Sequence, residues 1–234
     1  MKIFDKILDV FFPPNFTCDI CGIEIFNGDN LCNNCRDTVT VNNKFTCPVC
    51  GRKTPSAQLC LECKAQPPLY DRAVSPLVYS GGAQKLIVKF KNGNPYLKDY
   101  FARIMYAKCG NFTDADAVCY VPMTRSAERN RGYNQAELLA KELSDKLELP
   151  LLKDAVAKVR KSSSQKSLTR KERAQNLKAC FKAERSAVEG KTLILVDDVL
   201  TTGATADAVC GELKKRGAKK VYLVTIASVE NKET

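Results

Sequence analysis

Apolar positions in the last two thirds of the chain alternate between the spacing of strands and the spacing of helices. Continuous apolar runs predict strands, and apolar residues that recur every three or four positions predict helices. The predicted strands cover 73–79, 117–121, 155–159, 192–196 and 220–226, and the predicted helices cover 82–90, 96–109, 134–147 and 205–216. This alternation predicts an α/β domain with a mostly parallel sheet, in which ligands bind at the carboxyl ends of the strands.

The first twelve residues have the pattern of a short amphipathic helix. Phe4, Ile7, Leu8 and Phe11 recur at helical spacing, and a Pro-Pro pair ends the segment. Two interpretations remain: the helix packs on its own domain, or it contacts a membrane surface. Charged residues interrupt the apolar run, and no segment has the length of a transmembrane helix. We therefore expect a cytoplasmic protein, with peripheral contact at the inner face of the membrane as the alternative.

Cysteine is concentrated in one segment. Eight of the 12 cysteines lie in four C-x-x-C pairs that form an internal repeat, and the chain has no histidine. Nothing predicts export, so metal ligation explains the repeat better than disulfides do. We expect two tandem zinc ribbons, each with one structural zinc held by four thiolates; iron–sulfur clusters and interleaved pairing are the alternatives. The expected ligands are Cys18, Cys21, Cys32 and Cys35 in the first ribbon and Cys47, Cys50, Cys60 and Cys63 in the second.

The other four cysteines, Cys109, Cys119, Cys180 and Cys210, stand in apolar patterns and are expected to be buried thiols. The absence of histidine excludes nucleophilic chemistry that pairs histidine with serine or cysteine.

The net charge of +11 is carried entirely by the later part of the chain. Residues 1–64 contain seven Lys/Arg and seven Asp/Glu, whereas residues 158–182 contain nine Lys/Arg and one acid. Such a basic segment favours polyanions such as phosphates, nucleic acid or an acidic membrane, and a solvated basic loop is the alternative. Phe181 is its one aromatic residue, so stacking on single-stranded nucleic acid has little support.

The segment LILVDDVLTTGAT, residues 193–205, combines groups that suit a phosphorylated sugar. Asp197 and Asp198 follow a predicted buried strand, where carboxylates accept charge-assisted hydrogen bonds from hydroxyl groups. Three threonines follow, and Gly203 lets backbone amides approach an anion at the start of a helix. A phosphate beside two neighbouring hydroxyls is a ribose 5-phosphate. The carboxylates also suit Mg²⁺ bound through water.

VDDVLTTGAT resembles the motif that binds phosphoribosyl pyrophosphate (PRPP) in type I phosphoribosyltransferases. With VPMTRSAERNRGYNQAELLAKEL at 121–143, QKSLTRKERAQNLKACF at 165–181 and the cysteine repeat, the chain resembles the ComF family. That family joins a zinc-ribbon module to a phosphoribosyltransferase-like domain and is linked to natural competence. The resemblance implies that Asp197 and Asp198 hold the ribose hydroxyls. The implied PRPP-binding residues are Asp197, Asp198, Val199, Leu200, Thr201, Thr202, Gly203, Ala204 and Thr205.

The resemblance also implies a pyrophosphate loop after the strand at 117–121 and a flexible loop, residues 161–176, that closes over PRPP. The block 129–135 begins a helix and supplies guanidinium and amide groups; for each single arginine, a plain surface charge is the alternative. A hood near 79–110 would read the acceptor, but it identifies none, and no general base is evident. The candidates are Met123, Thr124, Arg125 and Arg131 near the pyrophosphate and Gln165, Arg173 and Asn176 in the closing loop.

The expected fold class is therefore α/β, a type I phosphoribosyltransferase-like parallel sheet with a small N-terminal double zinc-ribbon module. Residues 1–68 would form the N-terminal helix and double ribbon, and residues 69–234 the phosphoribosyltransferase-like domain. The resemblance implies a protein that binds PRPP with Mg²⁺ and handles single-stranded DNA during transformation, with a competence helicase or other DNA-uptake proteins as partners. The alternative is an active phosphoribosyltransferase of nucleotide salvage or metabolism with an unknown acceptor.

Overall fold

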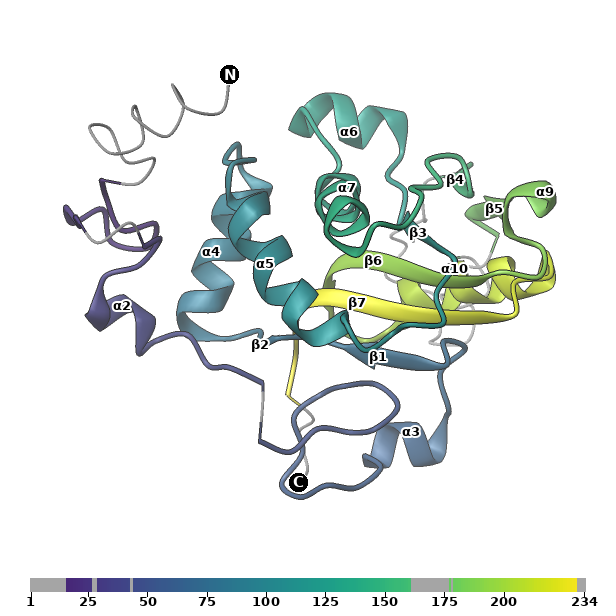
Figure 1. Cartoon of the computed structure of the whole chain (residues 1–234), viewed down its shortest axis with the longest axis horizontal. Helices are drawn as coiled ribbons and strands as arrows, with labels where there is room; N and C mark the ends of the chain where they lie inside the picture. The colour runs from purple at the N-terminus through teal and green to yellow at the C-terminus, as the bar shows by residue number, and fades with distance from the viewer. Residues whose placement is uncertain (1–15, 27–28, 43, 161–176, 178, 231–234) are drawn as a thin grey trace, which may run out of the picture.

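The centre of the molecule is a parallel sheet. The computed structural model describes residues 16–26, 29–42, 44–160, 177 and 179–230. The strand order is β1-β7-β6-β3, and β2 also pairs with β7 (Figure 1). All of these pairings are parallel, which confirms the predicted α/β domain. The strands are β1 Arg72–Val74, β2 Leu77–Val78, β3 Ala117–Tyr120, β6 Thr192–Leu200 and β7 Lys220–Ser228.

The edge of this sheet differs from the prediction of one strand over 73–79. Val74 pairs with Val224, and pairing resumes where Leu77 meets Ala227. Pro76 stands between them and has no backbone N–H to donate to a neighbouring strand. The predicted strand is therefore divided into β1 and β2.

The central strand β6 is longer than the predicted run 192–196. Its last residues, Val199 and Leu200, pair with Ala227 and Ser228 of β7. The two aspartates that end the apolar run are consequently part of the strand, because backbone pairing with β7 continues past them. The loop before the next helix is correspondingly short.

The two faces of the sheet have separate cores. Leu193 and Leu195 of β6 point into one core, and Ile194 and Val196 point into the other, as strand alternation requires. The core of Ile194 includes α4, α5 and α7; the core of Leu193 includes α10 and a small antiparallel pair, β4 and β5. The bounds are α4 Gly81–Lys91, α5 Leu97–Cys109, α6 Arg125–Arg131, α7 Gln135–Leu147, β4 Val156–Lys158, β5 Phe181–Ala183, α9 Arg185–Val188 and α10 Ala204–Lys215.

The cysteine module lies against the β1–β2 edge and beside α4 (Figure 1). It contains two short helices, α2 Asn33–Arg36 and α3 Leu61–Ala65. The amide of Ala73 donates to the carbonyl of Val49 at 2.7 Å, and the amide of Val78 donates to the carbonyl of Thr40 at 3.0 Å. These bonds satisfy polar groups that an open edge strand would leave unpaired.

Two predictions lie outside the described residues: the N-terminal helix at 1–12 and the closing loop at 161–176. Gln165, Arg173 and Asn176 belong to that loop. The other four cysteines are buried thiols, as expected. Among the described helices, none is both long enough and apolar enough to span a bilayer.

Candidate functional site

Two groups of four cysteines can each hold one metal ion. Within each group the sulfur atoms lie within 4.8 Å of one another. The groups follow the order of the sequence, which is consistent with the expected sequential pairing of the ligands. The first group is Cys18, Cys21, Cys32 and Cys35, which we call the first ribbon site; the second is Cys47, Cys50, Cys60 and Cys63, the second ribbon site.

At each site one thiol has a lowered pKa, whereas burial raises the pKa of Cys35, Cys50 and Cys63. Burial acts to raise the pKa of Cys18, but backbone hydrogen bonds at Cys21, Cys32 and Ile20 outweigh it and lower the pKa to about 6. In the same way, burial opposes and backbone hydrogen bonds lower the pKa of Cys47 to about 7. Four sulfur donors around one point fit a tetrahedral structural zinc, with no open position for a substrate.

We call residues Asp197–Thr205 the cradle, because they join the end of β6 to the start of α10. Gly203 is the N-cap of α10 and has a φ of 81°, a left-handed conformation that favours glycine. The Thr202 hydroxyl accepts a hydrogen bond from the amide of Ala204 at 3.3 Å. Thr201, Thr202 and Ala204 are exposed, so the start of the helix faces solvent. An anion placed there meets backbone amides and the positive end of the helix dipole.

The two aspartates of the cradle have different environments. Burial and the negative charge of Asp198 raise the pKa of Asp197 to about 7. A carboxylate oxygen of Asp197 accepts a hydrogen bond from the amide of Asp198 at 2.8 Å. Asp198 pairs with Lys91, the last residue of α4, at 2.9 Å. Two acidic groups at one strand end are costly without a ligand or a cation, and Lys91 offsets part of that cost.

The expected pyrophosphate loop leads into α6. Thr124 is the N-cap of this helix, and its hydroxyl accepts from the amide of Ala127 at 3.3 Å. Met123 is partly exposed just before it, and Arg125 is exposed at its first position. The Arg131 guanidinium donates to the Gln135 side-chain oxygen at 2.8 Å. These candidates line one short stretch after β3, but their contact with a ligand stays a prediction.

Part of the block 129–135 has a structural role. Asn134 caps α7: its side-chain oxygen accepts from the amide of Ala136 at 3.0 Å, and its nitrogen donates to the carbonyl of Val121 at 3.2 Å. The Tyr133 hydroxyl donates to the carbonyl of Phe90 and accepts from the amide of Gly93 at 3.2 Å. Tyr133 therefore fixes the end of α4, which carries Lys91.

Sequence reasoning missed two cations at the cradle. Lys91 lies in the segment assigned only to acceptor recognition, and Arg52 lies between two zinc-ligand pairs. The Arg52 guanidinium donates to the carbonyl of Thr201, 149 positions away. No spacing rule connects residues this far apart, although the FKNG stretch at 90–93 marks the end of a helix with a basic residue.

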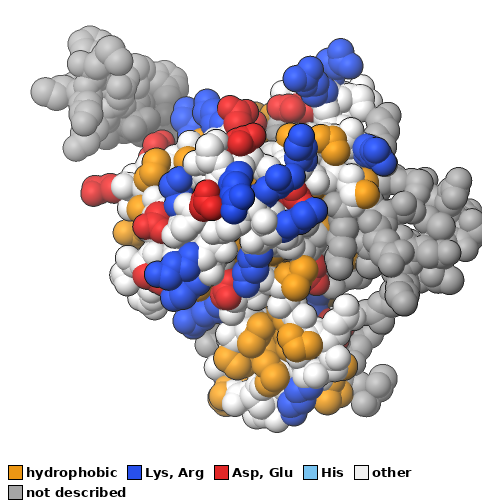
Figure 2. All heavy atoms as spheres, turned by 90° about the vertical axis from the view of Figure 1, so that its right-hand side faces the viewer, with side chains coloured by type: hydrophobic (Ala, Val, Ile, Leu, Met, Phe, Trp, Pro, Cys, Tyr) orange, Lys and Arg blue, Asp and Glu red, His pale blue; other side chains and the backbone are white. Residues whose placement is uncertain are grey.

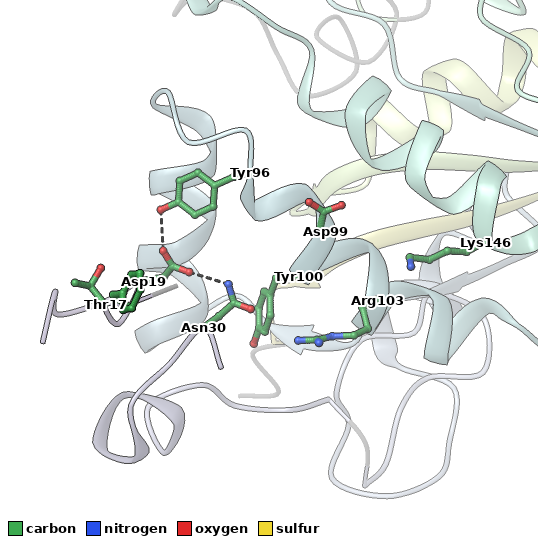
Figure 3. A pocket seen from close by; sticks show the side chains of 9 residues that line it. Thr17, Asp19, Asn30, Tyr96, Asp99, Tyr100, Arg103 and Lys146 are labelled. Atoms are coloured by element: carbon green, nitrogen blue, oxygen red, sulfur yellow. Dashed lines mark hydrogen bonds between the residues drawn. The ribbon is translucent and has the colours of Figure 1, made fainter. Parts of the chain in front are cut away.

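A hollow of about 550 Å³ lies between the first ribbon and α5, and its lining includes no cradle residue. Figure 3 shows Asp19 in its wall, with Asn30 and Tyr96 directed toward its carboxylate. The Tyr96 hydroxyl donates at 2.7 Å and the Asn30 amide at 2.9 Å. Lys89 of α4 adds an ion pair to Asp19 at 3.4 Å. These bonds attach the first ribbon to α4 and α5, so we interpret the hollow as part of a structural junction.

Two family models match different parts of the chain. The family model of the double zinc ribbon domain matches residues 7–64, and that of the phosphoribosyl transferase domain matches residues 134–234. The chain is also similar to a solved structure of glutamine PRPP amidotransferase from B. subtilis, with a TM-score of 0.40 at 20% identity over 54% of this chain and 25% of that chain.

Two curated relatives span nearly the whole chain. The DNA utilization protein YhgH of Escherichia coli is 28% identical over 88% of this chain and 94% of its own. Competence protein F of Haemophilus influenzae is 32% identical over 91% of this chain and 97% of its own. With the two ribbon sites and the parallel sheet in place, the chain belongs to the competence protein F (ComF) family, in which a double zinc ribbon precedes a phosphoribosyltransferase domain.

Proposed function

We propose that this protein binds PRPP together with Mg²⁺ in the cradle and handles single-stranded DNA during transformation. The observation that carries the PRPP proposal is the junction of β6 and α10. Asp197 and Asp198 stand near the end of the central strand, and Gly203 is the N-cap of a helix whose first residue, Ala204, is exposed. Carboxylates for a diol and amides for a phosphate are thus held within one short segment.

Different groups of the cradle bind the phosphate and the ribose of the ligand. The 5-phosphate accepts hydrogen bonds from the amides and hydroxyls of 201–205, and the ribose hydroxyls donate to Asp197 and Asp198. The hydroxyls then compete with Lys91 for Asp198, which releases a cation beside a ligand with several negative charges. Mg²⁺ arrives with the pyrophosphate, and the oxygen donors of the two aspartates suit that ion through water.

A binding experiment tests the cradle. In isothermal titration calorimetry with Mg²⁺, the double variant Asp197→Ala, Asp198→Ala should lose PRPP binding, because both acceptors for the diol are removed. Asp114→Ala is the matched control: this carboxylate pairs with Lys220 at 2.8 Å outside the cradle. Unchanged affinity in the double variant would exclude this site.

The DNA part of the proposal is supported by charge and by two relatives. One of them is named for competence and the other for DNA utilization. On the face drawn in Figure 2, the basic side chains form several groups with acidic ones among them. Residues 158–182 contain nine Lys or Arg and one acid, an excess of positive charge that favours a polyanion.

Salt dependence tests this part. Affinity for a single-stranded oligonucleotide should fall steeply as salt rises, because bound phosphates release counterions. Replacing Lys161, Lys166, Arg170 and Lys171 with serine should flatten that slope, whereas replacing Lys214, Lys215, Lys219 and Lys220 serves as an equal-charge control. Equal slopes for both variants would contradict a role for the basic segment.

The alternative is an active phosphoribosyltransferase, in which a nucleophilic acceptor bonds to C1 of the ribose and pyrophosphate leaves with its electron pair. The cradle favours this alternative as well, because the same contacts hold a reactive ribosyl centre. Pyrophosphate release from PRPP, measured with a panel of bases, amines and small acids with and without DNA, distinguishes turnover from binding.

A further inference from the structure

Arg52 of the second ribbon lies directly against the cradle. Its side chain is only 4% exposed, although it carries a full positive charge. One guanidinium nitrogen donates to the carbonyl of Thr201 and another to the carboxylate of Glu62. Glu62 is largely exposed, whereas the Arg52 guanidinium is buried against the loop that connects β6 to α10. Charge-assisted bonds of this kind are stronger than neutral ones.

The turn that presents Arg52 is built by the second ribbon site. The amide of Cys47 donates to the carbonyl of Arg52 at 2.9 Å, and the amide of Gly51 donates to the carbonyl of Cys47 at 2.9 Å. Arg52 follows Cys50 by two residues, so the position of the sulfur ligands sets the position of its backbone. A metal bound to these thiolates would hold the turn in one conformation.

The second ribbon and the cradle also share a core. The four cysteines of the second site belong to the same buried cluster as Leu200 and the inner face of α10. The amide of Leu69 donates to the carboxylate of Asp207 at 2.8 Å, close to the start of α10. Lys53 pairs with Glu230 at 2.8 Å. The second ribbon and the segment that follows it are therefore joined to the core beneath the cradle, to α10 and to Glu230 after β7.

The direction of one peptide bond explains how Arg52 affects an anion. In a trans peptide the C=O and N–H groups point in opposite directions. A Thr201 carbonyl held toward Arg52 consequently turns the amide of Thr202 away from the ribbon. That amide is the first of the series that leads into α10, and Thr202 is an exposed residue.

We propose that Arg52 is a positioning residue, which orients the phosphate-binding amides of the cradle, and that the metal in the second ribbon site sets PRPP affinity through it. This inference rests on the proposed binding of PRPP. It assigns the second ribbon a role in ligand affinity that the first ribbon does not share, since the first ribbon is attached to α4 and α5.

The test compares Arg52→Ala and Arg52→Lys with Arg36→Ala in the full chain. Arg36 is the matched control, an arginine of the first ribbon that pairs with Asp29 on the surface. Three quantities are measured for each: zinc per chain, hydrogen exchange of the peptide that spans 199–206, and PRPP affinity by calorimetry with Mg²⁺. Hydrogen exchange reports on the loop with no ligand present, and zinc content shows whether the ribbons stay intact.

We expect Arg52→Ala to retain its zinc, to exchange faster in the loop and to bind PRPP at least about tenfold more weakly, the factor for one hydrogen bond to a charged donor. Arg52→Lys keeps a charged donor and should recover part of the affinity, and Arg36→Ala should match the wild type. Unchanged loop exchange in Arg52→Ala overturns the inference, as does faster exchange with unchanged affinity. If the wild-type protein binds no PRPP, the proposed function itself is overturned. Binding to the wild type is therefore measured before binding to any variant.

Discussion

The two ribbons share a ligand pattern but differ in what surrounds the ligands. In the first ribbon Cys21 is exposed and Cys32 half-buried, and the site continues the core formed by α4, α5 and α7. In the second ribbon all four cysteines are buried, and the site continues the core beneath α10. A repeated sequence motif has therefore been attached to opposite faces of one sheet.

This difference shows that position, and not ligand chemistry, separates the two sites. In the part of the chain that the structure describes, the first ribbon reaches the cradle through a helix: it contacts α4, and the last residue of that helix, Lys91, pairs with Asp198. The second ribbon touches the cradle itself through Arg52. Three pairs of matched substitutions and one pH comparison test this difference between the ribbons.

The largest difference is expected for loss of one ligand at each site. Cys60→Ser in the second ribbon should lower the free energy of unfolding by about 4 kcal/mol or more, because an incomplete metal site would remain inside the shared core. Cys21→Ser should cost about 1–2 kcal/mol, since this ligand is exposed. Denaturant unfolding with parallel metal analysis measures both. Equal losses would show that the two sites are equivalent.

The second largest difference is expected for a matched pair of glycines. Both follow a C-x-x-C pair, with φ values of 76° at Gly22 and 67° at Gly51. A Cβ at Gly51 would lie 2.4 Å from the carbonyl oxygen of Ala73 in β1, whereas one at Gly22 meets nothing within 4 Å. Gly51→Ala should therefore cost about 3 kcal/mol and Gly22→Ala about 1 kcal/mol, the strain of the backbone conformation alone. Similar unfolding midpoints for the two would contradict tight docking on β1.

The free energy of unfolding should depend on pH because of Asp197 in the cradle. The pKa of Asp197, near 3.8 for an ordinary aspartate, is raised to about 7. Between these values the folded protein holds a proton that the unfolded chain has lost, so the free energy of unfolding falls as pH rises through this window. Asp197→Asn should remove that slope and stabilise the unliganded protein by about 1–2 kcal/mol at pH 8.

The PRPP affinity of the wild type should rise between about pH 6 and pH 8, because Asp197 loses its proton and the charged carboxylate is the better acceptor for hydroxyl groups. In Asp197→Asn this rise should be smaller. Phosphate titration is common to both proteins and cancels in the comparison. A wild-type stability profile that is flat over this range would show that Asp197 titrates as an ordinary aspartate.

The smallest effect is expected for surface ion pairs. Lys53 and Glu230 are 44% and 53% exposed, and Arg36 and Asp29 are 54% and 46% exposed. Lys53→Ala and Arg36→Ala should each change stability by about 0.5 kcal/mol or less. A larger loss for Lys53→Ala alone would indicate that this pair helps to hold the second ribbon against the end of β7.

Much of the fold follows from local patterns. The strands β3, β6 and β7 and the helices α4, α5, α7 and α10 were predictable because their apolar spacing reflects burial on one or two faces. The ligand sets of the ribbons were predictable because the chemistry of zinc fixes the spacing of cysteines. The division at Pro76 and the extension of β6 depend on pairing with β7, which lies about 150 residues after β1 in the chain.

The candidate site was predictable only in part for the same reason. Asp197 and Gly203 belong to one contiguous motif, so a strand followed by a helix suffices to locate them. Lys91 and Arg52 reach the motif from distant segments, and neither has a neighbouring pattern that indicates a contact. Asn134 has a role that the motif did not indicate, because the structure uses its side chain as a helix cap.

The position of β7 has a consequence for synthesis. Both β1 and β2 pair with β7, a strand translated more than a hundred residues later. The cysteine module therefore leaves the ribosome, and can bind its metal, well before β7 is available to pair with β1 and β2. During that interval β1 and β2 lack their partner β7, and the apolar surface left exposed on that side invites wrong partners. Completion of this protein thus depends on timing, with metal capture early and sheet closure late.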